Sequence, residues 1–164
     1  MLLIAESMQN IDDFQKNSPR TYEQVLLYEQ ALGMSIKKFP QVPPGWTYVN
    51  FWSDAQAKCI DLVYTATTGN GTLYIDQCGT KNRTNLSSLP SSEIRRVNVK
   101  NNKGWYITGG FVTTNGGKQI WDSTLPIKQV YWQADGLWMQ IVLTGDAALQ
   151  ADRDALISLA ESLH

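Results

Sequence analysis

The sequence predicts an α+β domain, in which one mainly antiparallel, twisted sheet of hairpins carries helices from both ends of the chain on one face. Residues 47–144 alternate apolar and polar side chains between short turns rich in Gly, Asn and Asp, which is typical of hairpins. Apolar residues recur at helical spacing on either side, over 1–38 and 147–164. The 164 residues suit one core, so we expect a single domain over 1–164 with about six or seven strands.

Two helices are predicted within residues 1–38. Ile4 and Met8 lie on an apolar helical stripe, which ends before Pro19. Thr21 opens a pattern typical of a capping box, and Gly33 supplies the stop signal of the second helix. The N-terminal part of the chain is therefore expected to be helical.

A proline-rich linker, FPQVPPGW, follows over residues 39–46. Proline lacks the backbone N–H donor and has a fixed φ, so three prolines in five residues disfavour both a helix and a central strand. We expect this linker to run extended into the sheet.

The first hairpin contains both cysteines of the chain, in KCIDLVYTATTGNGTLYIDQC. A four-residue loop over Thr67–Asn70 pairs Leu62 with Ile75, which places the apolar residues on one face. The same register places Cys59 opposite Cys78, at a separation that a disulfide can span. The pattern predicts a bridge and hence an oxidising compartment, and the alternative is two reduced, buried cysteines in the cytosol.

This register also places Asp61 opposite Asp76. Two close carboxylates form an acid/base pair or a hard-cation site in some proteins. No further acidic residues cluster nearby to complete a calcium loop, so we expect both side chains to turn into solvent and no metal to bind.

A second hairpin is predicted in VNVKNNKGWYI. A three-residue loop of Asn102, Lys103 and a left-handed Gly104 would pair Val99 with Ile107. Val97, Val99, Trp105 and Ile107 would then share one face.

The third hairpin has the clearest turn signal, Asp135-Gly136, which is typical of a type I′ turn. It pairs Trp132 with Met139, and Val130 with Ile141, on a face that we predict to be core.

The opposite face of this hairpin carries Tyr131, Trp138 and Gln140, because side chains alternate along a strand. Tyr and Trp suit half-wet binding surfaces, so these three residues are the predicted ligand-binding site for a sugar, peptide or lipid. The alternative is that the tryptophans of the chain, six in all, are core residues.

The last predicted element is a helix over residues 147–164 with Leu156, Leu159, Ala160 and Leu163 directed inward.

The sequence lacks the residues that most catalytic mechanisms require. The one histidine, His164, is the last residue, so serine or cysteine nucleophiles have no base and zinc lacks ligands. No glycine-rich phosphate-binding motif is present, so no catalytic residue and no cofactor are predicted.

The net charge of −1 without a basic stripe argues against nucleic-acid binding. No run of about 20 apolar residues predicts a membrane span, although a removed signal peptide or anchor would leave no trace.

The chain from about residue 20 to 164 resembles a known family. The segments VNVKNNKGWYI, QVYWQADGLWMQIVLTG and ALISLAESL, with the entry segment FPQVPPGWTYVNF, are similar to those of bacterial extracytoplasmic domains of unknown function. That family occurs at the C-terminal end of anti-sigma-factor-like proteins and beside lipoprotein-sorting-like domains. The resemblance implies a location in the cell envelope and a non-enzymatic sensory or binding role.

The leading hypothesis is therefore a non-catalytic, extracytoplasmic module, periplasmic, cell-surface or secreted, that binds a protein or small molecule. One alternative is a lipid or lipoprotein carrier with an apolar cavity between sheet and helices. The other is a hydrolase that uses Asp61, Asp76 or Asp122.

Overall fold

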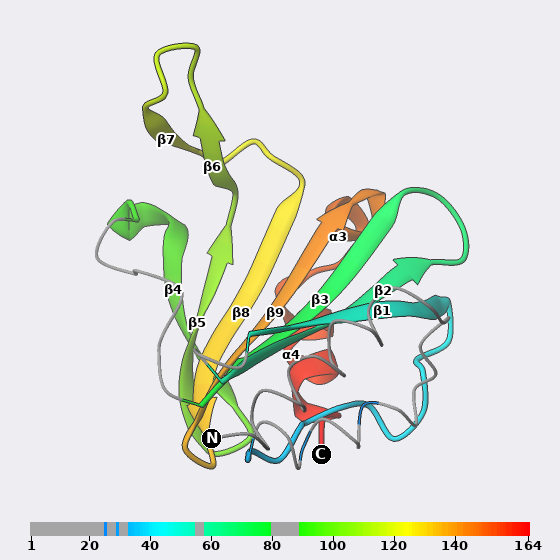
Figure 1. Cartoon of the computed structure of the whole chain (residues 1–164). Helices are drawn as coiled ribbons and strands as arrows, with labels where there is room; N and C mark the ends of the chain where they lie inside the picture. Colours follow the sequence, from blue (N-terminus) through cyan, green and yellow to red (C-terminus); the bar gives the residue numbers. More distant parts are fainter. Residues whose placement is uncertain (1–24, 26–28, 30–32, 55–57, 80–88) are drawn as a thin grey trace, which may run out of the picture.

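The computed structural model describes Val25, Glu29 and residues 33–54, 58–79 and 89–164. Within these residues, seven strands form one antiparallel sheet in the spatial order β1-β2-β3-β9-β8-β5-β4 (Figure 1). The strands of this sheet are β1 (Trp46–Asp54), β2 (Cys59–Ala66), β3 (Gly71–Cys78), β4 (Ile94–Val99), β5 (Asn102–Thr108), β8 (Ile127–Ala134) and β9 (Leu137–Gly145). The predicted antiparallel sheet is confirmed.

The centre of the sheet joins two hairpins that are distant in the sequence. Strand β3 of the first hairpin pairs with β9 of the last one, with Ile75 opposite Ile141. On its other edge, β9 pairs with β8, and β8 in turn pairs with β5. Residues from both halves of the chain thus meet on each face of the sheet.

The first hairpin has the predicted register. Leu62 lies opposite Ile75 and Cys59 lies opposite Cys78. The two cysteines form a disulfide, and their Cα atoms are 4.1 Å apart. The predicted bridge is therefore confirmed.

The third hairpin also has the predicted register, with Trp132 opposite Met139 and Val130 opposite Ile141. Its two turn residues have positive φ, 52° at Asp135 and 77° at Gly136, as a type I′ turn requires. All four paired side chains are buried in the core.

We expect Gly136→Val to lower the free energy of unfolding by at least about 1 kcal/mol, because a β-branched residue resists positive φ. Chemical denaturation would measure the loss. Gly116→Val is the matched control, since Gly116 lacks a positive φ and has open space around the position of a Cβ. Equal denaturation midpoints for the two variants would contradict the turn assignment.

The predicted register of the second hairpin is wrong. The turn is formed by Lys100 and Asn101, and Val99 lies opposite Asn102 instead of Ile107. Gly104 is a strand residue that lies opposite Val97, not a left-handed turn residue. Val97 and Val99 therefore pack on the core, whereas Trp105 and Ile107 point to the other face.

The packing of Gly104 explains much of the difference between the predicted and the observed register of this hairpin. A Cβ at this position would lie 2.7 Å from the carbonyl oxygen of Tyr131 and 3.1 Å from the Cβ of Trp132. Only glycine lets β5 approach β8 this closely, so the glycine belongs in the strand.

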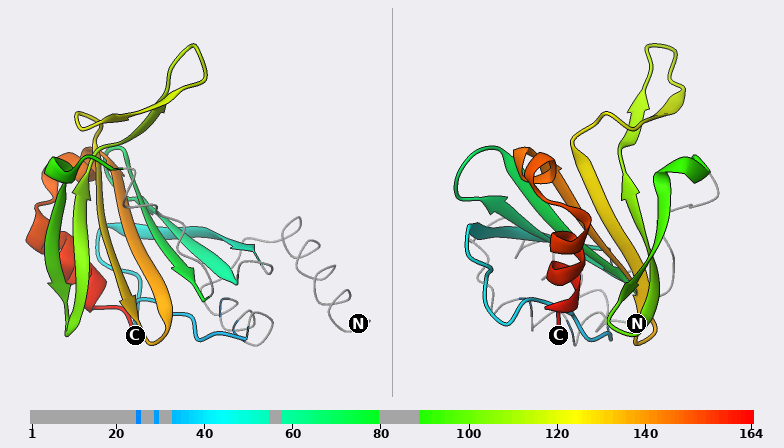
Figure 2. Two further views of the ribbon diagram at one scale, coloured as in Figure 1. Left: turned by 90° about the vertical axis from the view of Figure 1, so that its left-hand side faces the viewer. Right: turned by 180° about the vertical axis from the view of Figure 1, so that it is seen from behind.

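The predicted C-terminal helix is two helices, α3 (Asp146–Gln150) and α4 (Arg153–Glu161). The break occurs because the side chain of Asp152 accepts a hydrogen bond from the backbone N–H of Ala155, at 2.7 Å, and so begins a new helix. Both helices lie on one face of the sheet (Figure 2). Leu156, Ala160 and Leu163 are buried there as predicted, whereas Leu159 is only partly buried.

Residues 33–46, which include the predicted proline-rich linker and are called the linker from here on, cover the core beside α4. Ile36 and Phe39 are buried in the same hydrophobic cluster as Leu163. Lys38 and His164 exchange two backbone hydrogen bonds of 3.1 Å, which hold the linker against the end of the C-terminal segment.

Most of the predicted N-terminal helical region, residues 1–38, lies outside the described residues. Val25 and Glu29 are helical, whereas residues 33–38 are not, so the prediction of helix up to residue 38 is wrong at its end. Val25 belongs to the core, and the carboxylate of Glu29 accepts a hydrogen bond of 2.8 Å from the backbone N–H of Ile36. None of the helices in the described part of the chain has the length and apolar character needed to cross a membrane.

A two-stranded arm, β6 (Gly110–Thr113) and β7 (Gln119–Asp122), extends from the main sheet (Figure 2). The rings of Phe111 and Trp121 pack edge-to-face on it, 5.0 Å apart.

Candidate functional site

The predicted site residues lie together on the face of the sheet opposite α4. Trp105 of β5, Tyr131 of β8 and Gln140 of β9 are consecutive partners across three strands. Trp138 lies two residues along β9 from Gln140 and shares its face. We call Trp105, Tyr131, Trp138 and Gln140 the aromatic platform.

Ring stacking organises the aromatic platform. The rings of Tyr131 and Trp138 are nearly parallel, with centroids 5.4 Å apart and 12° between the planes. Trp105 comes from β5, which lies on the opposite side of β8 from β9, and its ring centroid is 6.0 Å from that of Tyr131. Tyr131 is buried, with 2% of its surface exposed, whereas Trp105 and Trp138 are half-buried and keep part of their surfaces accessible.

The hydroxyl group of Tyr131 is buried and has no hydrogen-bond partner among the described residues. Burial raises the pKa of this phenol, and the nearby carboxylate of Asp76 raises it further, so the hydroxyl keeps its proton and can donate. Leaving a buried hydroxyl unpaired costs about 1–3 kcal/mol, so a partner that accepts this hydrogen bond would recover stability.

Side-chain amides complete the platform. The Nε2 of Gln140 donates to the Oε1 of Gln129 at 2.6 Å, and the Nε2 of Gln129 donates to the backbone oxygen of Gly109 at 3.2 Å. These bonds orient Gln140, which is almost fully buried.

The disulfide lies beside the platform, because Cys78 is opposite Trp138 and Asp76 is opposite Gln140. A carboxylate oxygen of Asp76 is 3.5 Å from the sulfur of Cys78. Although Cys59, Asp76 and Cys78 bring potential ligand atoms close together, both sulfurs are joined in the bridge and offer no thiolate to a metal.

The three carboxylates considered for hydrolysis do not form one group. Asp61 and Asp76 face each other across β2 and β3, as predicted, but Asp122 belongs to the arm. The hydroxyl and backbone N–H of Thr124 donate to Asp122 at 2.6 and 2.9 Å, and these bonds lower the pKa of its carboxyl group. Asp122 is thereby held as an anion, which does not suit a general acid.

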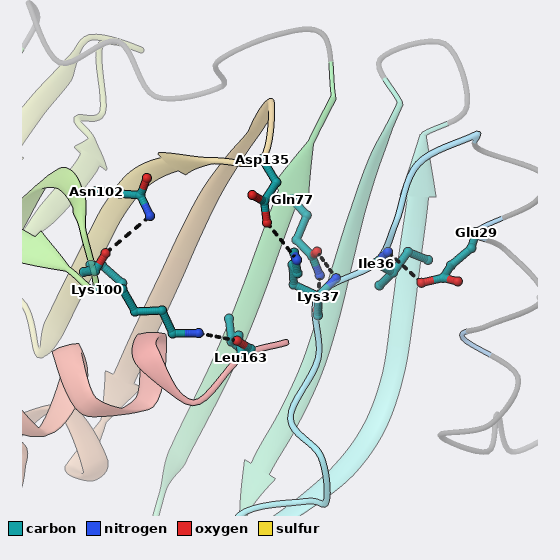
Figure 3. Close-up of polar contacts among 9 residues, drawn as sticks. Glu29, Ile36, Lys37, Gln77, Lys100, Asn102, Asp135 and Leu163 are labelled. Carbon is teal, nitrogen blue, oxygen red and sulfur yellow. Dashed lines mark hydrogen bonds and ion pairs between the residues drawn. The ribbon is translucent and has the colours of Figure 1, made fainter.

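Sequence reasoning missed a cavity of about 230 Å³ at the turn end of the sheet. We call it the turn-end cavity, and its lining includes Lys37, Lys100, Trp132, Asp135, Met139 and Leu163. Figure 3 shows the polar contacts of Lys37, Lys100, Asp135 and Leu163. Its walls come from the linker, two hairpin turns and the segment after α4. No local pattern in the sequence signals it, because these segments meet only in the folded chain.

The aromatic platform and the turn-end cavity lie on opposite faces of β8 and β9, since Tyr131 and Trp138 alternate with Trp132 and Met139. They can therefore be tested separately by substitution. In comparisons with known proteins, the chain matches no family model, no curated protein and no solved structure.

Proposed function

We propose that this domain is a non-catalytic binding module that works outside the cytoplasm and recognises its ligand through the aromatic platform. The observation that carries the proposal is the stacked pair of Tyr131 and Trp138, in which the buried Tyr131 hydroxyl has no hydrogen-bond partner among the described residues. A ligand with a flat apolar face would lie on the half-buried ring of Trp138, and a hydrogen-bond acceptor on the ligand would pair with the Tyr131 hydroxyl once binding exposes that group. Sugars and extended peptides have this chemistry.

The disulfide supports the proposed location. Structural disulfides persist in oxidising compartments and are rare in the cytosol. The resemblance of the chain from about residue 20 to 164 to bacterial extracytoplasmic domains supports the same placement in the cell envelope.

The packing between sheet and helices favours a binding module over a lipid or lipoprotein carrier. Leu156, Ala160 and Leu163 are buried in the core, and the turn-end cavity, which Ala160 and Leu163 help to line, has a volume of only about 230 Å³. A carrier would need an apolar cavity of roughly 300–1,000 Å³ in this layer.

Arrays of glycans and of peptides test the binding role. We expect a ligand that binds the wild-type domain to lose more than about 1 kcal/mol of binding free energy in Trp138→Ala, because this residue supplies the accessible ring of the stack. Tyr131→Phe, which removes only the hydroxyl, should lower the affinity for the same ligand without unfolding the domain. Titration of the selected ligand against each variant measures both losses.

Phe111→Ala is the matched control, since Phe111 is an aromatic residue with 44% of its surface exposed on the arm. Its binding should equal that of the wild type. If the selected ligands bind Trp138→Ala as tightly as the wild type, or if neither array yields a ligand, the proposal is wrong.

A further inference from the structure

The turn-end cavity joins four segments at one end of the sheet. Lys37 comes from the linker, Lys100 from the β4–β5 turn, Asp135 from the β8–β9 turn and Leu163 from the segment after α4 (Figure 3). Polar contacts hold these segments together, including the mutual hydrogen bonds of 2.6 Å between the side-chain amide of Gln77 and the backbone of Lys37. The cavity is therefore preformed.

One side of this cavity is apolar. Trp132 and Met139 face each other across β8 and β9 and form its inner wall, and Leu163 closes it from the helix side. All three side chains are buried in the core and cannot easily move away. This wall suits a short hydrocarbon or a single aromatic ring.

The mouth of the cavity carries two ammonium groups and one carboxylate. The Nζ of Lys37 is 2.9 Å from the Oδ2 of Asp135. The Nζ of Lys100 donates to the backbone oxygen of Leu163 at 3.0 Å. The pKa of Asp135 is lowered first by Lys37 and also by Lys100, so both ammonium groups act on the same carboxylate.

Both lysines retain binding capacity. An ammonium group has three donors, and each Nζ makes one such contact with the described residues. The nearby carboxylate of Glu161 is outside the cavity lining and accepts from the backbone N–H of Lys100, at 2.9 Å, rather than from its ammonium group. Within the part of the chain that the structure describes, the Lys100 side chain therefore forms no ion pair with a carboxylate.

We infer that the turn-end cavity binds a small organic carboxylate whose apolar part lies on Trp132, Met139 and Leu163, while its charge lies between Lys37 and Lys100. The volume of about 230 Å³ limits the ligand to a short one, because sites for drug-sized molecules span roughly 300–1,000 Å³. This inference goes beyond the proposed function, because the cavity is on the other face of the sheet from the aromatic platform.

Phenylacetate, phenylacetamide and acetate are the test ligands, titrated into the full chain by calorimetry and followed by amide and indole NMR signals. Phenylacetate has both the charge and the ring, phenylacetamide has only the ring, and acetate has only the charge. We expect phenylacetate to bind best and to shift the signals of Trp132 and Lys100. Equal binding of phenylacetate and phenylacetamide would overturn the inference.

The same chemistry occurs at the C-terminal carboxylate of a peptide that ends in an apolar residue. Glycyl-phenylalanine and its C-terminal amide distinguish this source from a free acid. Binding of the dipeptide acid but not of phenylacetate would assign the cavity to a chain end, and the reverse would assign it to a free acid.

Two isosteric changes should move the affinity in opposite directions. Lys37→Gln or Lys100→Gln should lower the affinity for phenylacetate by about threefold to tenfold. This loss lies between the effect of an exposed ion pair and that of a hydrogen bond to a charged group. Asp135→Asn should raise the affinity by about twofold to fivefold, because the carboxylate that competes for Lys37 is removed. Asparagine also tolerates the positive φ of this turn position, so the hairpin is preserved.

Lys103→Gln is the matched control, because Lys103 is an exposed lysine of β5 that does not line the cavity. Its affinity for phenylacetate should equal that of the wild type. Weaker or unchanged binding by Asp135→Asn, or an equal loss in Lys103→Gln, would overturn the assignment.

Discussion

Replacing Cys59 and Cys78 together with alanine is expected to lower the free energy of unfolding by about 3 kcal/mol, the value of the chain-entropy model for a loop of this size. The bridge spans a sequence separation of 19 residues, so its loss frees a substantial loop in the unfolded chain. Both residues are buried, and alanine leaves no unpaired polar group behind. Chemical denaturation of the wild-type protein and the double variant would measure the difference.

Reduced wild-type protein provides the control for this experiment. It should lose a similar amount of stability, because it lacks the same constraint while keeping both side chains. Mass spectrometry of the unreduced protein should show no free thiol from either cysteine. Two free thiols, or equal denaturation midpoints for oxidised wild type and double variant, would contradict the assignment.

Gly104→Ala is expected to cost about 2–3 kcal/mol of unfolding free energy, in the upper part of the range for overpacked sites. The added Cβ would lie 2.7 Å from the carbonyl oxygen of Tyr131, a backbone atom that cannot move without disturbing the pairing of β5 and β8. Chemical denaturation would measure the loss.

Gly116→Ala is the control for Gly104→Ala, because a Cβ at Gly116 would meet no atom within 4 Å. It should change stability little. If Gly104→Ala were as stable as this control, Gly104 would not be a strand residue packed against β8.

The second hairpin shows why local patterns can fail. Trp105, Tyr106 and Ile107 form a continuous apolar run, and Tyr106 and Ile107 are buried on opposite faces of β5. Alternation therefore cannot indicate which face belongs to the core. The register depends instead on the fit of Gly104 against β8, which is a contact between distant parts of the chain.

The aromatic platform depends partly on local sequence, whereas the turn-end cavity depends on contacts between distant segments. Alternation around Asp135-Gly136 correctly placed Tyr131, Trp138 and Gln140 on one face, because the turn determines the register of its own strands. Their role in binding remains a prediction. The addition of Trp105 to the platform and the existence of the turn-end cavity depend on the pairing of β5 with β8 and on the docking of the linker.

The sequence by itself determined the first and third hairpins, the opposition of Cys59 and Cys78, and the apolar side of the C-terminal region. These features depend on turn chemistry and on side-chain alternation over a few residues, which are local properties. Only the tertiary structure decided the order of the strands, the break between α3 and α4, the place of Gly104 and the meeting of Lys37, Lys100 and Asp135. These depend on close packing between segments that are far apart in the sequence, where several local arrangements are similar in energy and the shared core selects one of them.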